Sequence, residues 1–318
     1  MYLDLRKKTK VITVLLLKQI VILFIMMGCG YLIVRTRLLT SEDSRVLSVL
    51  VVYLIMPCVI IKSFQIELTD NIIKGFIMAT VSAVCIHLLL FVFTAALGKC
   101  IKLDQVEKAS LIYSNSGNLI IPMVTAILGE EWVIYASAFL CVQMLFLWTH
   151  GQSLIKGEKA FSIDKILKNL NLIAVIVGFI LMICKVKLPD VLYSTLGSIS
   201  GTIGPVSMVM LGMMLAGMDM KRIFYNRKLY IISMIKMFIM PAVVLIIMKL
   251  SGIYTLTEDG SMIGYISILA VITPTATAVT QLAQLYNKDA EYSGAINAMT
   301  TLVCIVTMPL MTQLYMLM

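Results

Sequence analysis

Long apolar runs separated by short charged segments dominate the chain, and they predict membrane-spanning helices. Runs that lack Asp, Glu, Lys and Arg and reach the roughly 20 residues of a spanning helix lie at 75–98, 109–129, 132–155, 191–218, 261–287 and 292–318. Weaker spans lie at 11–34, 46–61, 169–184 and 229–248. The pattern predicts an all-α integral membrane protein with ten transmembrane helices.

The fourth and ninth predicted helices are each interrupted by polar residues and a proline. The fourth contains Asn115, Ser116, Gly117, Asn118 and Pro122, and the ninth contains Thr273, Pro274 and Thr275. Lipid offers no hydrogen-bond partner to a broken backbone, and an unsatisfied group there costs several kcal/mol. These eight residues are therefore the candidate substrate-binding residues, because such breaks persist where they line a functional cavity.

Each break also has a structural explanation that the sequence leaves open. Pro122 frees the carbonyl of Asn118, so we expect unwinding over 115–121 and a half-helix that aims its positive end at an anion from near Pro122. Alternatively, the helix is only kinked and its asparagines bond neighbouring helices. In the ninth helix, the threonine hydroxyls can satisfy the carbonyls that Pro274 releases.

Glycines and prolines recur at one spacing and indicate an internal repeat. Gly30 and Pro57 are 27 residues apart, as are Gly178 and Pro205, and the two pairs are offset by 148. Pro122 and Pro274 are offset by 152. Each unit has five helices, an odd number, so the second unit must be inverted and the breaks should meet near the midplane. We predict a first repeat at 1–155, a cytoplasmic connector at 156–168 and a second, inverted repeat at 169–318.

Composition and charge fit a protein of the cytoplasmic membrane. The chain is 60% hydrophobic and 14% charged, and its net charge of +9 follows from basic cytoplasmic loops rather than from nucleic-acid binding. The loops after odd-numbered helices hold fifteen Lys and Arg residues, against five in the loops on the opposite side. This bias predicts that both termini lie outside, although the basic amino-terminal tail argues for the reverse.

Few polar side chains lie at mid-membrane apart from the two breaks. His87 is a candidate proton site or a structural histidine, and we expect Lys18 and Lys236 to extend toward the membrane surface. Gln143, Gln281 and Asn297 are candidate lining residues. No carboxylate lies at mid-membrane, which argues against a cation exchanger, and no motif predicts a metal, a cofactor or an enzyme.

Three stretches together resemble the auxin efflux carrier family of membrane transporters, whose bacterial members include malate permeases. They are 114–122 (SNSGNLIIP), 208–216 (MVMLGMMLA) after Pro205, and a carboxyl-terminal set that includes 274–276, 282–286, 300–302 and Pro309. The resemblance implies two inverted five-helix units, a scaffold of helices 1, 2, 6 and 7, and a mobile part of helices 3–5 and 8–10. It also implies that helices 4 and 9 cross at Pro122 and Pro274, and it allows a homodimer.

The sequence as a whole predicts a secondary transporter that moves a small organic anion, such as a dicarboxylate or an auxin-like acid, across the lipid bilayer. Asn115 and Asn118 would donate hydrogen bonds to the carboxylate, and the half-helix ends would supply positive potential. A proton- or cation-coupled antiporter that uses His87 is the alternative. A ligand receptor is disfavoured because it needs an output domain, and no polar segment is long enough to form one.

Overall fold

The computed structural model describes residues 18, 21–22, 24–65, 67, 69–157, 170–217 and 226–317, in which every regular element is a helix. The side chains of residues 52, 117, 118, 122 and 126 lie outside this description. The predicted connector at 156–168 and the basic amino-terminal tail also fall mostly or wholly outside it. The all-helical prediction is confirmed for the described residues.

In the first half of the chain, the first helical stretch that the structure describes without a gap is Phe24–Arg35. The following elements are α2 (Ser44–Leu50), η1 (Val51–Ile55), α3 (Met56–Ser63), α4 (Asp70–Ile101), α5 (Gln105–Ile112), η2 (Ser116–Ile120), α6 (Ile121–Ile127), η3 (Glu130–Trp132), α7 (Val133–Phe146), η4 (Leu147–Gly151) and α8 (Gln152–Lys156). Elements η1, η2 and η4 are single turns of π-helix, and η3 is a 3-10 turn.

The second half continues after the connector. Its elements are α10 (Leu170–Ile183), α11 (Asp190–Ser200), α12 (Ile203–Ala216), α14 (Arg227–Met234), η5 (Ile235–Ile239), α15 (Met240–Leu250), η6 (Ile253–Thr255), α16 (Gly260–Ile272), α17 (Thr277–Leu285) and α18 (Ala290–Leu317). Element η5 is a π-helical turn and η6 a 3-10 turn. The fourth and ninth predicted helices are the two that the structure divides by extended backbone, into α5 with η2 and α6, and into α16 with α17.

Three prolines each lie two residues after the end of a π-helical turn. Pro57 follows η1, Pro122 follows η2 and Pro241 follows η5. A proline lacks the N–H that would bond the carbonyl four residues earlier, and its ring clashes with that carbonyl. A π turn widens the helix at this point and accommodates the clash. The sequence expectation of unwinding over 115–121 is not met, because residues 116–120 form the π-helical turn η2 and α6 follows at Ile121.

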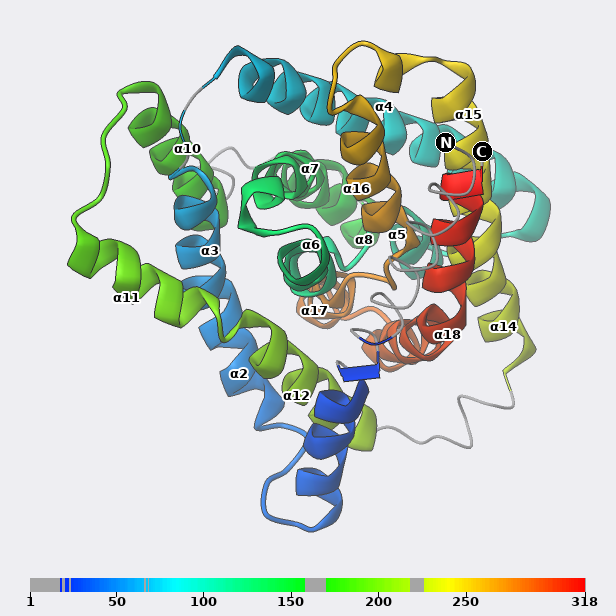
Figure 1. Ribbon diagram of the computed structural model, residues 1–318. Helices are drawn as coiled ribbons and strands as arrows, with labels where there is room; N and C mark the ends of the chain where they lie inside the picture. Colours follow the sequence, from blue (N-terminus) through cyan, green and yellow to red (C-terminus); the bar gives the residue numbers. More distant parts are fainter. Residues whose placement is uncertain are drawn as a thin grey trace.

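The helices form two groups around α6 and α17, which lie at the centre of Figure 1. In one group α3 packs on α10 and α11, and α2 packs on α12. In the other group α4 packs on α7 and α16, and α18 packs on α14, α16 and α17. Element η2 contacts both α12 and α16, so the first break lies where the two groups meet.

Glycines bring two pairs of helices into close contact. A Cβ at Gly30 would lie 2.1 Å from the carbonyl oxygen of Val209 on α12, and one at Gly212 on α12 would lie 1.8 Å from the carbonyl oxygen of Met27. A Cβ at Gly178 on α10 would lie 2.7 Å from the ring of Phe64, next to the end of α3. The first and seventh predicted helices thus touch backbone to backbone, and the sixth packs closely on the end of the second.

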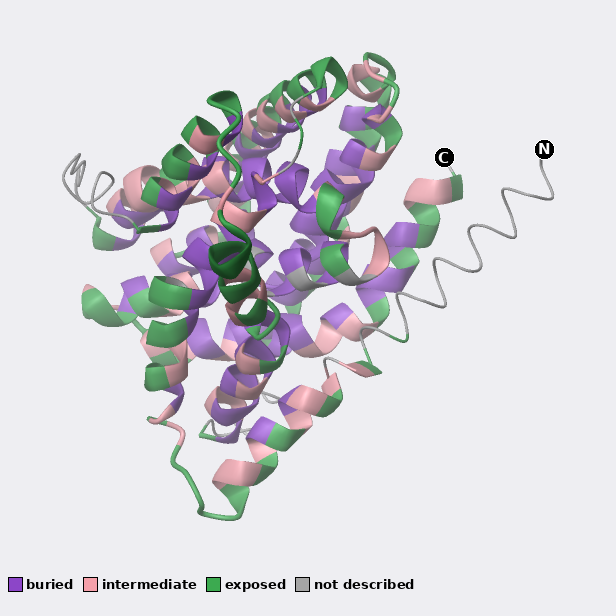
Figure 2. Ribbon diagram, turned by 60° about the vertical axis from the view of Figure 1, so that its left-hand side comes forward, coloured by how far each residue is buried: buried purple, intermediate pink, exposed green. Residues whose placement is uncertain are grey.

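The outer surface is apolar, as expected for a chain in lipid. Figure 2 shows buried residues where helices meet and exposed residues along their outer faces. Many large apolar side chains lie on this surface, including Val92, Val191 and Leu250. Within the described residues, six helices are long and apolar enough to span a membrane, and three shorter apolar helices accompany them. Exposed apolar side chains on so many helices fit a surface that faces lipid rather than water.

Candidate functional site: the crossing of the broken helices

The two breaks meet in a short antiparallel pairing at the centre of the molecule. Ser114 and Thr275 form an isolated β-bridge. The amide of Asn115 donates to the carbonyl of Pro274 at 2.7 Å, and the amide of Ala276 donates to the carbonyl of Tyr113 at 3.0 Å. Four helix ends therefore converge on this pairing, which we call the crossing: the carboxyl ends of α5 and α16, and the amino ends of η2 and α17.

The crossing lies earlier in the first break than the sequence analysis predicts. The backbone leaves the helix at Tyr113, whose φ of −93° and ψ of 120° are extended, and η2 begins at Ser116. The half-helix that follows the break therefore starts at Ser116 and not near Pro122. Pro274 lies at the crossing as predicted, but Ser114, not Pro122, is the residue bridged to the second break. The expectation of a Pro122–Pro274 crossing is wrong because the π turn before Pro122 stays helical.

Polar side chains satisfy the carbonyls that the breaks leave free. Thr275 Oγ1 donates to the carbonyl of Ser110 at 3.0 Å, and Thr273 Oγ1 donates to that of Ala270 at 2.8 Å. Gln143 Nε2 on α7 donates to the carbonyl of Ser114 at 2.7 Å. Asn297 Nδ2 on α18 donates to that of Thr275 at 2.6 Å. Each broken helix is thus held by an amide from the next helix along the chain. Both threonine hydroxyls therefore donate hydrogen bonds to backbone carbonyls. This agrees with the structural explanation of the second break, in which threonines satisfy carbonyls that the proline releases.

Lys236 on η5 also holds the crossing, a role that its sequence surroundings do not reveal. Its side chain is 1% exposed. Its Nζ donates to the carbonyl of Leu111 at 3.0 Å and to Ser114 Oγ at 2.7 Å. The expectation that Lys236 extends to the membrane surface is wrong, because these acceptors hold its amine inside the protein. A lysine at the centre of a transmembrane helix costs about 2.5–3.5 kcal/mol on insertion scales, so its retention here needs an explanation.

Several buried polar atoms next to the crossing have no hydrogen-bond partner in the described structure. They are Asn115 Nδ2, Ser116 Oγ, Ser110 Oγ and Gln143 Oε1. An unsatisfied buried donor costs about 1–3 kcal/mol. Asn115 and Ser116 therefore carry free donors at the amino end of η2, where the helix dipole also favours negative charge. The side chains of Gly117, Asn118 and Pro122 lie outside the described residues.

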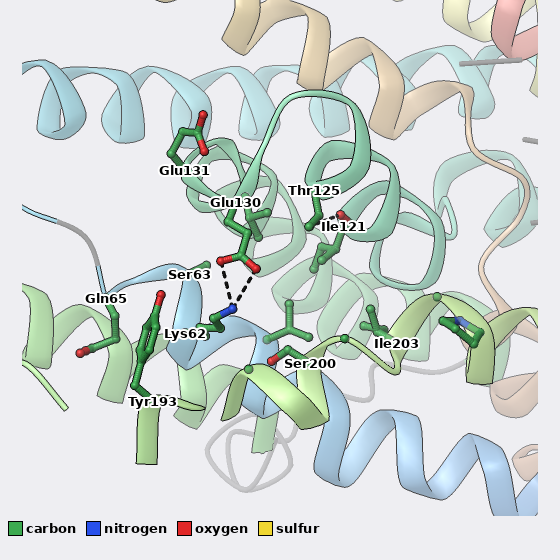
Figure 3. Close-up of a pocket in the computed structure, with 16 residues that line it drawn as sticks. Lys62, Ser63, Gln65, Ile121, Thr125, Glu130, Glu131, Tyr193, Ser200 and Ile203 are labelled. Atoms are coloured by element: carbon green, nitrogen blue, oxygen red, sulfur yellow. Dashed lines mark hydrogen bonds and ion pairs between the residues drawn. The ribbon is translucent and has the colours of Figure 1, made fainter. Parts of the chain in front are cut away.

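A cavity of about 310 Å³ lies between the two helix groups. It is lined on one side by α3, α11 and the start of α12, and on the other by α6, η3 and the start of α7. Figure 3 shows Lys62 of α3 bonded to Glu130 of η3 in this cavity, with Nζ to carboxylate distances of 2.8 and 3.0 Å. The lining includes Ile121, which directly follows η2, but none of the residues of the crossing itself.

His87 on α4 is fully buried between aromatic rings. Its Nδ1 pairs with the carbonyl of Ala83 at 2.7 Å, and its Nε2 has no partner. The rings of Phe139 and Phe146 lie 5.2 and 5.4 Å from the imidazole. The one bonded nitrogen fits a structural role, while the free Nε2 leaves the candidate proton role open.

A buried carboxylate lies about two helical turns before the crossing. Glu107, in the first turn of α5, is 0% exposed. It forms a capping box with Asp104, pairs with Lys228 Nζ at 2.8 Å and accepts from Tyr292 OH at 2.9 Å. Its charge is thus already neutralised by its partners. Among the described residues, no three His, Cys, Asp or Glu side chains cluster as a metal site would require.

Comparison with known proteins identifies the family. Residues 15–165 and 159–312 match a family model described as membrane transport protein. The chain belongs to this family, the auxin efflux carriers. The family resemblance seen in the sequence is thereby confirmed. Members of the auxin efflux carrier family are transporters rather than enzymes, and the chain is a multi-pass membrane protein. No curated protein sequence matches the chain.

Proposed function

We propose that this auxin efflux carrier family member is a secondary transporter that binds a small organic anion at the crossing and moves it by alternating access. The observation that carries the proposal is the pair of unpartnered donors, Asn115 Nδ2 and Ser116 Oγ, beside the amino end of η2. A carboxylate accepts several hydrogen bonds and is stabilised at a helix amino terminus. Asn118 is a further proposed donor. Thr273, Pro274 and Thr275 shape the crossing, since their hydroxyls and carbonyls are engaged there.

We also propose that the chain consists of two inverted five-helix repeats, 1–155 and 169–318, with helices 1, 2, 6 and 7 as the scaffold. The close helix contacts support this arrangement, because Gly30 packs on helix 7 and Gly178 packs on the residue that ends helix 2. The two segments that match the family model meet at 159–165, within the proposed connector. Reciprocal hydrogen bonds at the crossing are what a twofold axis in the membrane plane would produce.

The proposed orientation makes the cavity an entrance from outside. With both termini outside, the segments around Lys62 and Glu130 lie on the extracellular side, and the cavity they line lies between the proposed scaffold and transport part. Alternating access then consists of a movement of one helix group against the other that closes this cavity and opens the crossing to the cytoplasm.

Transport by proteoliposomes tests the proposal. Uptake of radiolabelled succinate, malate and indole-3-acetate is measured for wild type, Asn115→Ala, Asn118→Ala and the control Asn71→Ala, which alters an exposed asparagine at the start of α4. Losing one hydrogen bond to a charged ligand costs about 1.5–3 kcal/mol, so we expect uptake at low substrate concentration to fall by about 10- to 100-fold in Asn115→Ala. Uptake that is unchanged in both Asn115→Ala and Asn118→Ala would refute the assigned site.

The unpartnered Nε2 of His87 supports a second candidate, in which transport is coupled to protons. In that case an imposed pH gradient drives uptake by wild type. We expect His87→Gln, which keeps a side chain able to bond Ala83, to abolish the response to the gradient while exchange of substrate across the membrane continues. A gradient response that survives in His87→Gln excludes His87 as the coupling site.

A further inference from the structure

Lys236 is a buried lysine without an acidic partner among the described residues. Nothing in the described part of the chain places a carboxylate in an ion pair with it, and its two bonded partners, the carbonyl of Leu111 and the hydroxyl of Ser114, are both neutral. The nearby Glu107 is engaged by Lys228 and Tyr292. The charged form of a buried lysine needs an oppositely charged partner, and an anion bound at the crossing would supply one.

The amine also has spare bonding capacity. An ammonium group carries three N–H donors, and the two acceptors account for two of them. One of these acceptors belongs to Ser114, which directly precedes Asn115 and its unpartnered amide. The spare donor of Lys236 and the free donors of Asn115 and Ser116 thus belong to one connected group of residues.

The elements around Lys236 do not supply a negative partner either. Elements α5, α14, α15, α16 and α18 contact η5, and their acidic residues are Glu107 on α5 and Glu291 at the start of α18. Neither is bonded to Lys236, whose amine bonds Leu111 and Ser114.

We propose that Lys236 is the fixed positive charge for which the substrate supplies the counterion, so that it sets the preference of the site for carboxylates over neutral analogues. The inference rests on the proposed transport function and extends it, because it assigns the charge selectivity to a residue outside both broken helices. In the empty site the ammonium caps the carboxyl end of α5, and in the occupied site the anion completes its charge balance.

Binding constants for acids and their neutral amides test this assignment. The full-length purified protein is titrated calorimetrically with succinate and succinamide, and with indole-3-acetate and indole-3-acetamide. The readout is the preference, defined as the dissociation constant of the amide divided by that of the acid. The proteins are wild type, Lys236→Met, Lys236→Arg and Lys249→Met, which removes the same charge from an exposed position on α15.

We expect wild type and Lys249→Met to share one preference for acids, Lys236→Met to lower it at least tenfold, and Lys236→Arg to keep most of it. A purely structural role for Lys236 would weaken acid and amide binding alike and leave the preference unchanged. A folded Lys236→Met protein with the wild-type preference would therefore overturn the inference while leaving the transport function intact.

Two further outcomes are informative. If wild type binds none of the acids, the proposed function fails and the inference fails with it. If Lys236→Met does not yield a monodisperse protein, Lys236→Gln takes its place, because it removes the charge but keeps a hydrogen-bond donor. We expect Lys236→Gln to lower the preference at least tenfold, and a folded Lys236→Gln protein with the wild-type preference would overturn the inference.

Discussion

Two amide side chains on neighbouring helices stabilise the crossing by bonding its free carbonyls. Gln143 and Asn297 each bond one carbonyl of the crossing, on Ser114 and Thr275 respectively. The sequence singled out both as lining residues together with Gln281, but Gln281 bonds Ser48 on the surface instead. An amide in an apolar helix is visible in sequence. Which carbonyl it meets depends on helix packing.

We expect Asn297→Ala to destabilise the protein, because it leaves the buried carbonyl of Thr275 without its partner. The cost of such a group is about 1–3 kcal/mol. Thermal unfolding in detergent measures it, and Gln313→Ala, at an exposed position of the same helix, is the matched control. A melting temperature for Asn297→Ala equal to that of the control would contradict the role given to this amide.

At the scale of helices, two glycines let the first helix and α12 touch. In lipid the hydrophobic effect does not drive helices together. Close van der Waals packing of the two backbones stabilises their association instead. Gly30 meets the backbone of Val209, whereas Gly28, on the same helix, has open space around its Cα. Gly30 and Gly178, which recur at the repeat spacing, therefore both lie where two helices pack closely. Their spacing in the sequence indicated a repeat but not this packing.

The two glycines give a matched experiment within one helix. Gly30→Ala must separate the helix from α12, and we expect a clear fall in melting temperature. Gly28→Ala creates no clash and gains helix propensity, worth about 0.5–1 kcal/mol, so it should be neutral or stabilising. Equal melting temperatures for the two variants would show that the backbone contact is absent in the folded protein.

At the scale of the whole molecule, the ion pair in the cavity connects the two helix groups. Lys62 is 16% exposed and Glu130 62% exposed, and Lys62 also lies over the ring of Tyr193 on α11. A closing movement of the cavity changes the spacing of α3 and η3, so the pair contributes to the balance between conformations. Exposed pairs of this kind contribute about 0.2–1 kcal/mol.

We expect Glu130→Gln to disfavour the conformation described here. The equilibrium constant between this conformation and the closed one should change by up to about five-fold. A cysteine at Ser200, which lines the cavity, reports this shift through its rate of reaction with a charged thiol reagent in membranes. The rate should fall in Glu130→Gln and recover in the charge-swapped Lys62→Glu/Glu130→Lys variant. An unchanged rate in Glu130→Gln would exclude the pair from the conformational balance, and protein without the added cysteine gives the background.

The sequence by itself determined the membrane-spanning helical architecture, the two broken helices and the family, because apolar length and backbone-breaking residues act locally. Only the tertiary structure decided that Ser114 rather than Pro122 meets the second break, since that choice depends on the π turn at η2 and on its partners. Tertiary structure also decided where the amine of Lys236 lies. Nothing in the residues around it distinguishes a lysine that reaches the membrane surface from one whose amine binds a helix end more than a hundred positions away.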